Sequence, residues 1–240
     1  MSKIIVRPVA NKKEKYTFST FPWQIYKDDP LWVPPILSER MKVIDPYRGT
    51  FFKRGEAEFF IAWDDGKPVG TICAAEDPPT NTNRGTKECV FGFLETIDDY
   101  TVFEALVNQA AQWAKSRGLE ALFGPFNLDY EDSYGVLIDG RDRPPAIMCG
   151  HTPEYYPGFM DRFGFYPARD QNIALAIDLN SPELVRFSTY SLPPSHVCDL
   201  SISGSFPGSS RTNPKNPETM ESICCLPYAE RLDLAFKKSC

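Results

Sequence analysis

The sequence predicts a mixed α/β (α+β) fold, in which helices flank both faces of a central mixed sheet. Asp65-Gly66 separates two apolar runs, and this dipeptide is the strongest short-range signal of an antiparallel hairpin. An amphipathic helix expected at 101–117 lies between apolar strands expected at 87–95 and 121–124, as in a parallel crossover connection. Antiparallel and parallel strand pairs in one chain indicate a mixed sheet with helices packed on it.

The elements before the crossover helix are short. Residues 4–9 are apolar and β-branched, which is typical of a strand. Pro22 interrupts the helical periodicity of residues 13–26, because proline lacks the amide hydrogen that a helix interior requires. The other elements expected here are a short helix at 36–44, hairpin strands at 58–63 and 67–75, and a polar loop at 78–85.

The crossover helix has the clearest signals in the chain. Its apolar residues recur with a period close to that of a helix. Thr101 and Glu104 fit a capping box at its start, and Gly118 fits the position just after its end. A second helix at 155–163 and a last strand at 172–179 complete the expected domain.

The last quarter of the sequence differs in composition from the rest. Residues 181–240 are rich in serine and proline, and their charges cancel, so the net charge of -6 belongs to residues 1–180. Such a segment buries too little apolar surface to offset the entropy lost on ordering. We therefore expect a domain over residues 1–180 and a poorly ordered tail over 181–240, from a truncated or frame-altered sequence, with a short helix within 218–238.

Composition argues against several classes of function. A net charge of -6 argues against nucleic-acid binding and against broad binding to anionic membranes, both of which favour basic surfaces. No apolar run of about 18 residues could span a bilayer, and the N-terminal apolar run is too short for a signal peptide, so we expect a cytoplasmic protein. Cys73, Cys89 and Cys149 are far apart and only 2 histidines are present, so no metal site is expected.

Polar residues gather in one loop directly after the strand expected at 121–124. They are Asn127, Asp129, Glu131, Asp132 and Tyr134. Binding sites often lie on loops at the ends of buried strands, so these side chains are candidates for orienting a substrate amine. The alternative is a solvated acidic turn, capped by asparagine and aspartate side chains.

Two tyrosines mark the start of the helix expected at 155–163. Tyr155 and Tyr156 are either ligand contacts or residues of a packed face whose hydroxyls are solvated. His151 precedes them, and a lone histidine can act as a general base. The simpler interpretation is that His151 lies on a surface loop.

Several segments of the chain together resemble the GNAT superfamily of N-acetyltransferases, in a bacterial branch of hypothetical GNAT-like acyltransferases. They fall within residues 4–179 and are 21–23 with 29–35, Phe91-Gly92-Phe93-Leu94-Glu95, Gly124-Pro125-Phe126-Asn127, 144–148, and Tyr155-Tyr156 with 163–165. The resemblance implies the fold of that superfamily and transfer of an acyl group from acyl-CoA or acetyl-CoA to an amine. A long-chain amino base is one candidate acceptor.

The resemblance also implies roles for individual residues. The backbone groups expected to pair with the pantetheine arm of CoA are those of Phe91, Gly92, Phe93 and Leu94. Glu95 stands where some members keep a base that acts through water, and Tyr156 is a candidate for the acid that protonates the departing thiolate. The candidate substrate contacts are Asn127, Asp129, Asp132, Tyr134 and Tyr155.

Two departures from the superfamily pattern bear on the reaction. Its phosphate-binding loop is glycine-rich, whereas residues 95–100 contain no glycine and three carboxylates, whose charge opposes phosphate at a helix N-terminus. Met160 stands where many members have the tyrosine acid, and it has no proton to give. Two functions stay open: a CoA-dependent N-acyltransferase, or a GNAT-fold module that has lost CoA chemistry and binds a small ligand or a partner protein. The enzyme is placed ahead, because the superfamily can hold pantetheine through backbone groups alone.

Overall fold

The computed structural model describes residues 3–128, 132–146, 149–168, 172–176, 221–226 and 228–231. The chain divides into two compact units, Met1–Ala174 with Ile223–Cys240, and Leu175–Ser222. The pocket and the helices and strands that form it belong to the first unit. Asp129, one of the candidate substrate contacts, lies outside the described residues.

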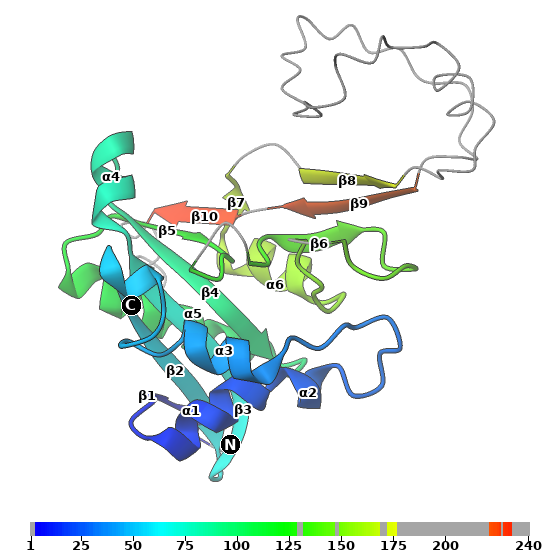
Figure 1. Ribbon diagram of the computed structural model, residues 1–240, viewed down its shortest axis with the longest axis horizontal. Helices are drawn as coiled ribbons and strands as arrows, with labels where there is room; N and C mark the ends of the chain where they lie inside the picture. Colours follow the sequence, from blue (N-terminus) through cyan, green and yellow to red (C-terminus); the bar gives the residue numbers. More distant parts are fainter. Residues whose placement is uncertain are drawn as a thin grey trace, which may run out of the picture. The chain divides into compact units, whose positions relative to one another are not determined.

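A seven-stranded mixed sheet forms the centre of the first unit (Figure 1). Its strands, in spatial order, are β1 (Ile5–Pro8), β2 (Glu56–Asp64), β3 (Lys67–Glu76), β4 (Glu88–Thr96), β5 (Ala121–Gly124), β10 (Tyr228–Arg231) and β7 (Tyr166–Pro167). β4 and β5 run parallel, and the other neighbouring strands are antiparallel. The expectation of a mixed sheet is therefore confirmed. Strands β6 (Val136–Asp139), β9 (Glu221–Leu226) and β8 (Asn172–Ala176) form a second sheet in that order.

The β2–β3 hairpin turns at the expected dipeptide. Asp65 has φ 46° and Gly66 has φ 76°, the positive values that a two-residue hairpin turn requires. Along β2 the side chains alternate between two cores: Phe59 and Ile61 belong to one, and Phe60 belongs to the other. The sheet is therefore buried on both faces.

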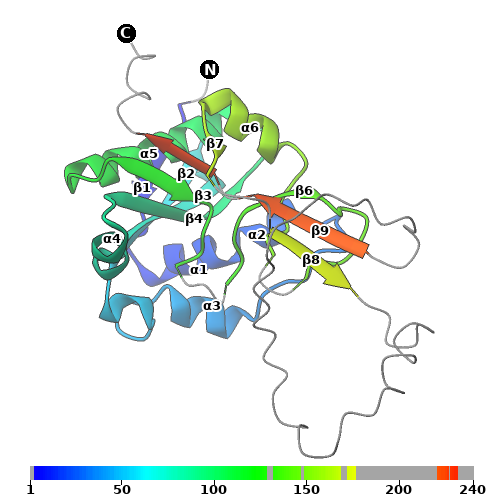
Figure 2. The ribbon, with the colours of Figure 1, turned by 90° about the horizontal axis from the view of Figure 1, so that it is seen from above.

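Helices cover each face of the main sheet, as Figures 1 and 2 show. On one face lie α1 (Lys12–Thr20), α2 (Pro22–Ile25), α3 (Leu37–Val43) and a short 3-10 turn at Phe51–Lys53. On the other lie α5 (Tyr100–Ser116) and α6 (Tyr156–Phe163). Pro22 is the first residue of α2, where its missing amide hydrogen costs nothing, so the expected break falls between α1 and α2.

Two local expectations were wrong. The segment expected as a polar loop contains the helix α4 (Pro78–Arg84), because Asp77 accepts a hydrogen bond from the Thr80 amide and Gly85 ends the helix at φ 64°. The cap of α5 is Asp99, whose carboxylate accepts from the Thr101 amide at 2.8 Å. Thr101 is therefore inside the helix and does not form the expected capping box.

The C-terminal part of the chain also differs from the expectation. The structure has strands at Glu221–Leu226 and Tyr228–Arg231, where a short helix was expected. β10 pairs with both β5 and β7, with Ala229 opposite Phe123 and Tyr166. A late segment of the chain thus takes part in the main sheet, and the domain boundary at residue 180 stays a prediction.

An irregularity in β4 sets the direction of its last side chains. Between Gly92 and Glu95 this strand has one residue more than its partner β3 has between Cys73 and Thr71. Phe93, within this β-bulge, has φ 48°. The bulge shifts the alternation of β4, so that Phe93 packs with the core under α1 and α3.

Candidate active site

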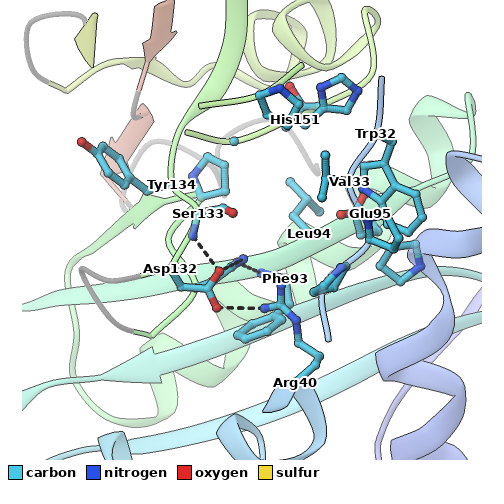
Figure 3. A pocket seen from close by; sticks show the side chains of 18 of the residues that line it. Trp32, Val33, Arg40, Phe93, Leu94, Glu95, Asp132, Ser133, Tyr134 and His151 are labelled. Atoms are coloured by element: carbon cyan, nitrogen blue, oxygen red, sulfur yellow. Dashed lines mark hydrogen bonds and ion pairs between the residues drawn. The ribbon is translucent and has the colours of Figure 1, made fainter. Parts of the chain in front are cut away.

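A cavity of about 730 Å³ opens beside the end of β4 (Figure 3). Its lining comes from α1 and the residues up to α3 (Phe18, Ser19, Pro22, Trp32, Val33, Pro34, Pro35, Ile36 and Arg40), from the strands (Thr71, Phe93, Leu94 and Glu95), and from the segment after β5 (Pro125, Asn127, residues 132–135, Pro145, Ala146 and residues 149–152). Much of this lining is apolar or aromatic. Such a cavity lies in the usual size range of small-molecule sites.

Glu95 places a carboxyl group in this apolar wall. The Tyr26 hydroxyl donates a hydrogen bond to Glu95 Oε2 at 2.9 Å. Burial of the carboxyl group raises the pKa of Glu95 to about 7, and this outweighs the opposing effects of Tyr26, Tyr156 and the charge of Arg40. Glu95 can therefore gain and lose a proton near neutral pH, which is what a general base requires.

Tyr155 and Tyr156, at the start of α6, form hydrogen bonds with the backbone at the end of β4. Tyr156 is fully buried, and its hydroxyl accepts from the Thr96 amide at 2.9 Å and lies 3.3 Å from Glu95 Oε2. Tyr155 donates to the Thr96 carbonyl oxygen at 2.5 Å. Burial raises the pKa of both hydroxyls, and neither side chain lines the cavity. The structure thus places Tyr156 beside Glu95 but does not bring Tyr155 to the cavity wall.

Three of the polar residues after β5 meet at one wall of the cavity. Asn127 Oδ1 accepts from the Phe93 amide at 2.6 Å, and its Nδ2 lies 3.5 Å from Asp132 Oδ1. Asp132 pairs with Arg40 at 2.9 Å, and Tyr134 also lines the cavity. Asn127, Asp132 and Tyr134 therefore gather as expected, but Asn127 and Asp132 already bond to other groups of the chain.

Several residues of the site were not predicted from the sequence. Tyr26 and Arg40 come from the N-terminal helices and reach Glu95 and Asp132, 69 and 92 residues away. His151 was expected on the surface, but its side chain is only 10% exposed, and its Nε2 lies 2.7 Å from Asp29 Oδ2. No periodicity or motif links such pairs, because their proximity depends on how α2 and α3 pack against the sheet.

β4 pairs with β5 only over Glu88–Val90. Members of the superfamily are expected to bind pantetheine along the edge of β4 beyond this pairing, but groups of this chain occupy that edge. The Phe126 amide donates to the Phe91 carbonyl oxygen at 2.7 Å, and Asn127 bonds the Phe93 amide. Tyr156 lies 3.2 Å from the Leu94 carbonyl oxygen. A methyl group added at Gly92 would lie 2.0 Å from the Phe126 carbonyl oxygen. Three of the backbone groups expected to pair with pantetheine, the Phe91 and Leu94 carbonyl oxygens and the Phe93 amide, are thus already bonded within the chain.

The turn before α5 is equally unsuited to phosphate. The Asp99 carboxylate accepts a hydrogen bond from the Thr101 amide, which is one of the donors that a bound phosphate would use. The Thr96 amide is taken by Tyr156. With the occupied edge of β4, these contacts mean that the residues present do not fit the usual CoA-binding mode.

Within the described residues, no group of three or more histidine, cysteine, aspartate or glutamate side chains could hold a metal ion. Over the same part of the chain, no helix has the length and apolar character needed to cross a bilayer.

Changing Asn127 to alanine is expected to destabilise the fold by about 1–3 kcal/mol, because it leaves the partly buried Phe93 amide without a partner. The free energy of unfolding in urea measures the effect. Asn83→Ala, at an exposed position on α4, is the matched control and should change stability by no more than about 0.5 kcal/mol. Equal stabilities of the two variants would show that the Asn127 contact is not needed to hold the bulge.

Comparison with known proteins agrees with this fold. A model of the acetyltransferase (GNAT) family matches residues 22–129. The chain is 33% identical over 166 residues to "Bacterial ceramide synthase" of Caulobacter vibrioides, covering 69% of this chain and 43% of that protein. It is 34% identical over 167 residues to "Protein YghO" of Escherichia coli, covering 69% and 42%. The chain thus spans less than half the length of these relatives.

A solved structure shows the same fold at low sequence identity. The crystal structure of an N-acetyltransferase from Staphylococcus aureus superposes with a TM-score of 0.50 at 10% identity, covering 96% of this chain and 99% of that one. The family match, the related sequences and the shared fold agree with one another. Residues 22–129 therefore belong to the acetyltransferase (GNAT) family, and the chain shares the fold of a solved N-acetyltransferase.

Proposed function

We propose that this chain is an N-acyltransferase domain that transfers an acyl group from a thioester to an amine, with the amine bound in the cavity beside β4. The observation that carries the proposal is the Glu95 carboxyl group, with a pKa of about 7, in the apolar wall of a cavity of about 730 Å³. Amines are protonated at neutral pH and cannot attack a carbonyl carbon in that form. A base in the cavity wall can remove this proton from the amine.

Glu95 is proposed as the group that takes the proton. In its ionised form it accepts a proton from the bound ammonium group, and both groups become neutral, which an apolar cavity favours. Tyr26 donates to Oε2 of Glu95 and fixes the direction of the carboxylate. The buried hydroxyl of Tyr156 lies close to both the Leu94 carbonyl oxygen of β4 and Oε2 of Glu95. Tyr156 therefore holds Glu95 and the end of β4 in place and does not contact the amine. Tyr156 is therefore a positioning residue in this proposal.

The proposed acceptor is an amine with a long alkyl chain. Trp32, Val33, Ile36 and several prolines give one part of the cavity an apolar surface. Of its polar lining residues, Arg40, Asn127 and Asp132 already interact with one another. One relative is called a ceramide synthase, and ceramide is an N-acylated long-chain amino base. Both the lining and that name support a long-chain amine in preference to a polar acceptor.

The donor class rests on family membership. GNAT proteins generally use an acyl-CoA co-substrate, so a CoA thioester is the proposed donor. The groups that usually hold CoA are engaged within this chain. A cytoplasmic location is likewise a proposal, made from the sequence.

A second function is favoured by two observations. The occupied edge of β4 and the acidic turn before α5 suit a GNAT-fold module that binds a ligand without carrying out CoA chemistry. In that case the cavity binds the same apolar amine, and a different protein or domain performs the transfer.

Calorimetric titration of the full chain separates the two functions. We expect saturable binding of a long-chain amine and no binding of its short-chain analogue, because most of the binding energy comes from apolar contact. Acylation of the amine in the presence of acyl-CoA would support the enzyme. Amine binding without acyl-CoA binding or turnover would favour the module. No binding of the long-chain amine by the folded chain would contradict both.

A further inference from the structure

Arg40, on α3, places a guanidinium group in the wall of the cavity, beside Asp132 and Phe93 (Figure 3). Its side chain is only 16% exposed. Nη1 donates to Asp132 Oδ2 at 2.9 Å, and the guanidinium carbon lies 4.9 Å from the centre of the Phe93 ring. Among the described residues, Nε and Nη2 have no hydrogen-bond partner, and neither atom is fully buried. Because a guanidinium group carries five N–H donors, most of those of Arg40 are unused.

Asp132 and Phe93 hold this guanidinium group in one direction. Asp132 Oδ1 accepts from the Ser133 amide at 2.6 Å, and Oδ2 accepts from Arg40. The Phe93 ring, at the bulge of β4, packs against the guanidinium carbon. The unused donors of Arg40 therefore keep a fixed direction before any ligand binds. Fixed donors of this kind stabilise charge that develops in a transition state, because they need no rearrangement during the reaction.

The backbone donors at the end of β4 are already engaged. The Phe93 amide donates to Asn127 Oδ1 at 2.6 Å, and the Thr96 amide donates to the Tyr156 hydroxyl. Acyl transfer needs such donors, because the carbonyl oxygen gains negative charge when its carbon is attacked. Among the described residues that line the cavity, Arg40 alone is a lysine or arginine. Its side chain is therefore the part of the wall best suited to that charge.

The charge of Arg40 also acts on Glu95. It is one of the effects that oppose the rise in the pKa of Glu95 caused by burial. Both side chains line the same cavity. The base and the cation therefore share one electrostatic environment, in which an amine that has lost its proton to Glu95 attacks the carbonyl group.

We propose that the unused N–H groups of Arg40 bind the carbonyl oxygen of the thioester and stabilise the oxyanion formed during acyl transfer. This inference rests on the proposed function. The neutral amine attacks the carbonyl carbon, so a C–N bond forms and an electron pair moves to the oxygen that Arg40 binds. The pair then returns, the C–S bond breaks, and the leaving thiolate takes the proton that the nitrogen loses. The products are an amide, a thiol and protonated Glu95, which returns its proton to water.

Two other roles for Arg40 have less support. A carboxylate or phosphate group on the substrate would meet a pair without net charge, because Asp132 already balances Arg40. A purely structural ion pair gains most from a bidentate contact, whereas one nitrogen of Arg40 donates to one oxygen of Asp132. An oxyanion that exists only during the reaction fits unused donors on a balanced pair.

Steady-state kinetics of amine acylation with Arg40→Met tests the proposal. Methionine fills much of the same space and has no donor. We expect kcat to fall by about 10²- to 10³-fold with an unchanged KM for the amine, because the contact strengthens only in the transition state. Lys42→Met is the matched control, since Lys42 is exposed on α3 and pairs with Glu39 on the surface. Its rate should equal that of the native chain.

A double variant separates lost chemistry from lost stability. Arg40→Met alone leaves the Asp132 carboxylate without its ion pair, so its midpoint of unfolding in urea should fall. Adding Asp132→Asn removes the unpaired charge and should restore most of the midpoint but not kcat. Recovery of kcat together with stability would make Arg40 a structural residue and overturn the proposal. A raised KM with a native kcat would also overturn it, because Arg40 would then bind the substrate in its ground state.

Calorimetry with a stable analogue gives a readout that needs no turnover. A long-chain N-alkyl phosphonamidate has a tetrahedral phosphorus and a negative oxygen in the place of the oxyanion. We expect the native chain to bind it, and Arg40→Met to bind it about tenfold more weakly or worse. Affinity for the parent amine should be the same in both. Equal affinity of the two proteins for the phosphonamidate would overturn the proposal.

These measurements also distinguish failure of this inference from failure of the proposed function. Acylation by Arg40→Met with the native kcat would overturn the inference and leave the function standing. If the native chain binds the phosphonamidate through Arg40 but acylates no amine, the enzyme proposal fails, and the donors of Arg40 stand as a binding site for a tetrahedral anion.

Discussion

Replacing Glu95 with glutamine is expected to lower kcat/KM for amine acylation by about 10²- to 10⁴-fold, the usual contribution of a positioned base. Glutamine has nearly the same size and can still accept the hydrogen bond that Tyr26 donates, but it cannot take a proton at neutral pH. The measurement is acylation of a long-chain amine at pH 8. Glu154→Gln is the matched control, since Glu154 is exposed just before α6. Equal rates for both variants would remove Glu95 from the mechanism.

The pH dependence of the native chain gives an independent check of the same role. The ionised form of Glu95 is the base, so the rate should rise with pH through about 7 and then level off. The Glu95→Gln variant should lose this limb of the profile. A native rate that is flat between pH 6 and about 8 would contradict the assignment.

Stability should move in the opposite direction to activity. The pKa of Glu95 is raised from 4.5 to about 7, so the fold favours the neutral carboxyl group. Its contribution to stability is full below pH 4.5 and is lost as pH rises through about 7, by at most about 3 kcal/mol. Glu95→Gln should therefore be more stable than the native chain at pH 8, as measured by urea unfolding. A less stable variant would mean that the ionised carboxylate is needed by the fold.

Gly92→Ala is expected to destabilise the fold by more than about 3 kcal/mol. Its methyl group would lie 2.0 Å from the Phe126 carbonyl oxygen and 3.1 Å from the Asn127 Cα atom, and both are backbone atoms. Overpacking against backbone cannot be relieved by a change of rotamer, so β4 and the segment after β5 have to separate. Urea unfolding of the purified variant measures the loss.

Gly158→Ala is the matched control for Gly92→Ala. Gly158 lies within α6 and has open space where the methyl group would be placed, so alanine should stabilise the helix by up to about 1 kcal/mol. A Gly92→Ala variant as stable as the native chain would show that the segment after β5 does not close the edge of β4. The backbone of β4 would then be free to hold pantetheine.

Local signals predicted the fold class well. The Asp65-Gly66 hairpin and the periodic helix α5 occur where the sequence places them, because both depend on neighbouring residues only. The error at α4 has a simple cause: Pro78–Arg84 has no apolar face, so periodicity did not reveal it. Its cap residues, Asp77 and Gly85, were visible in the sequence and would have indicated a helix.

The sequence by itself determined the hairpin, the crossover helix, the superfamily and the gathering of Asn127, Asp132 and Tyr134 after β5. Only the tertiary structure decided which groups surround Glu95. The bulge at Phe93 shifts the alternation of β4, and it depends on the pairing with β3. Tyr26 reaches Glu95 because α2 packs beside β4, 69 residues away in sequence. Hydrogen bonds over such separations follow from packing, whereas periodicity and turn signals act over only a few residues.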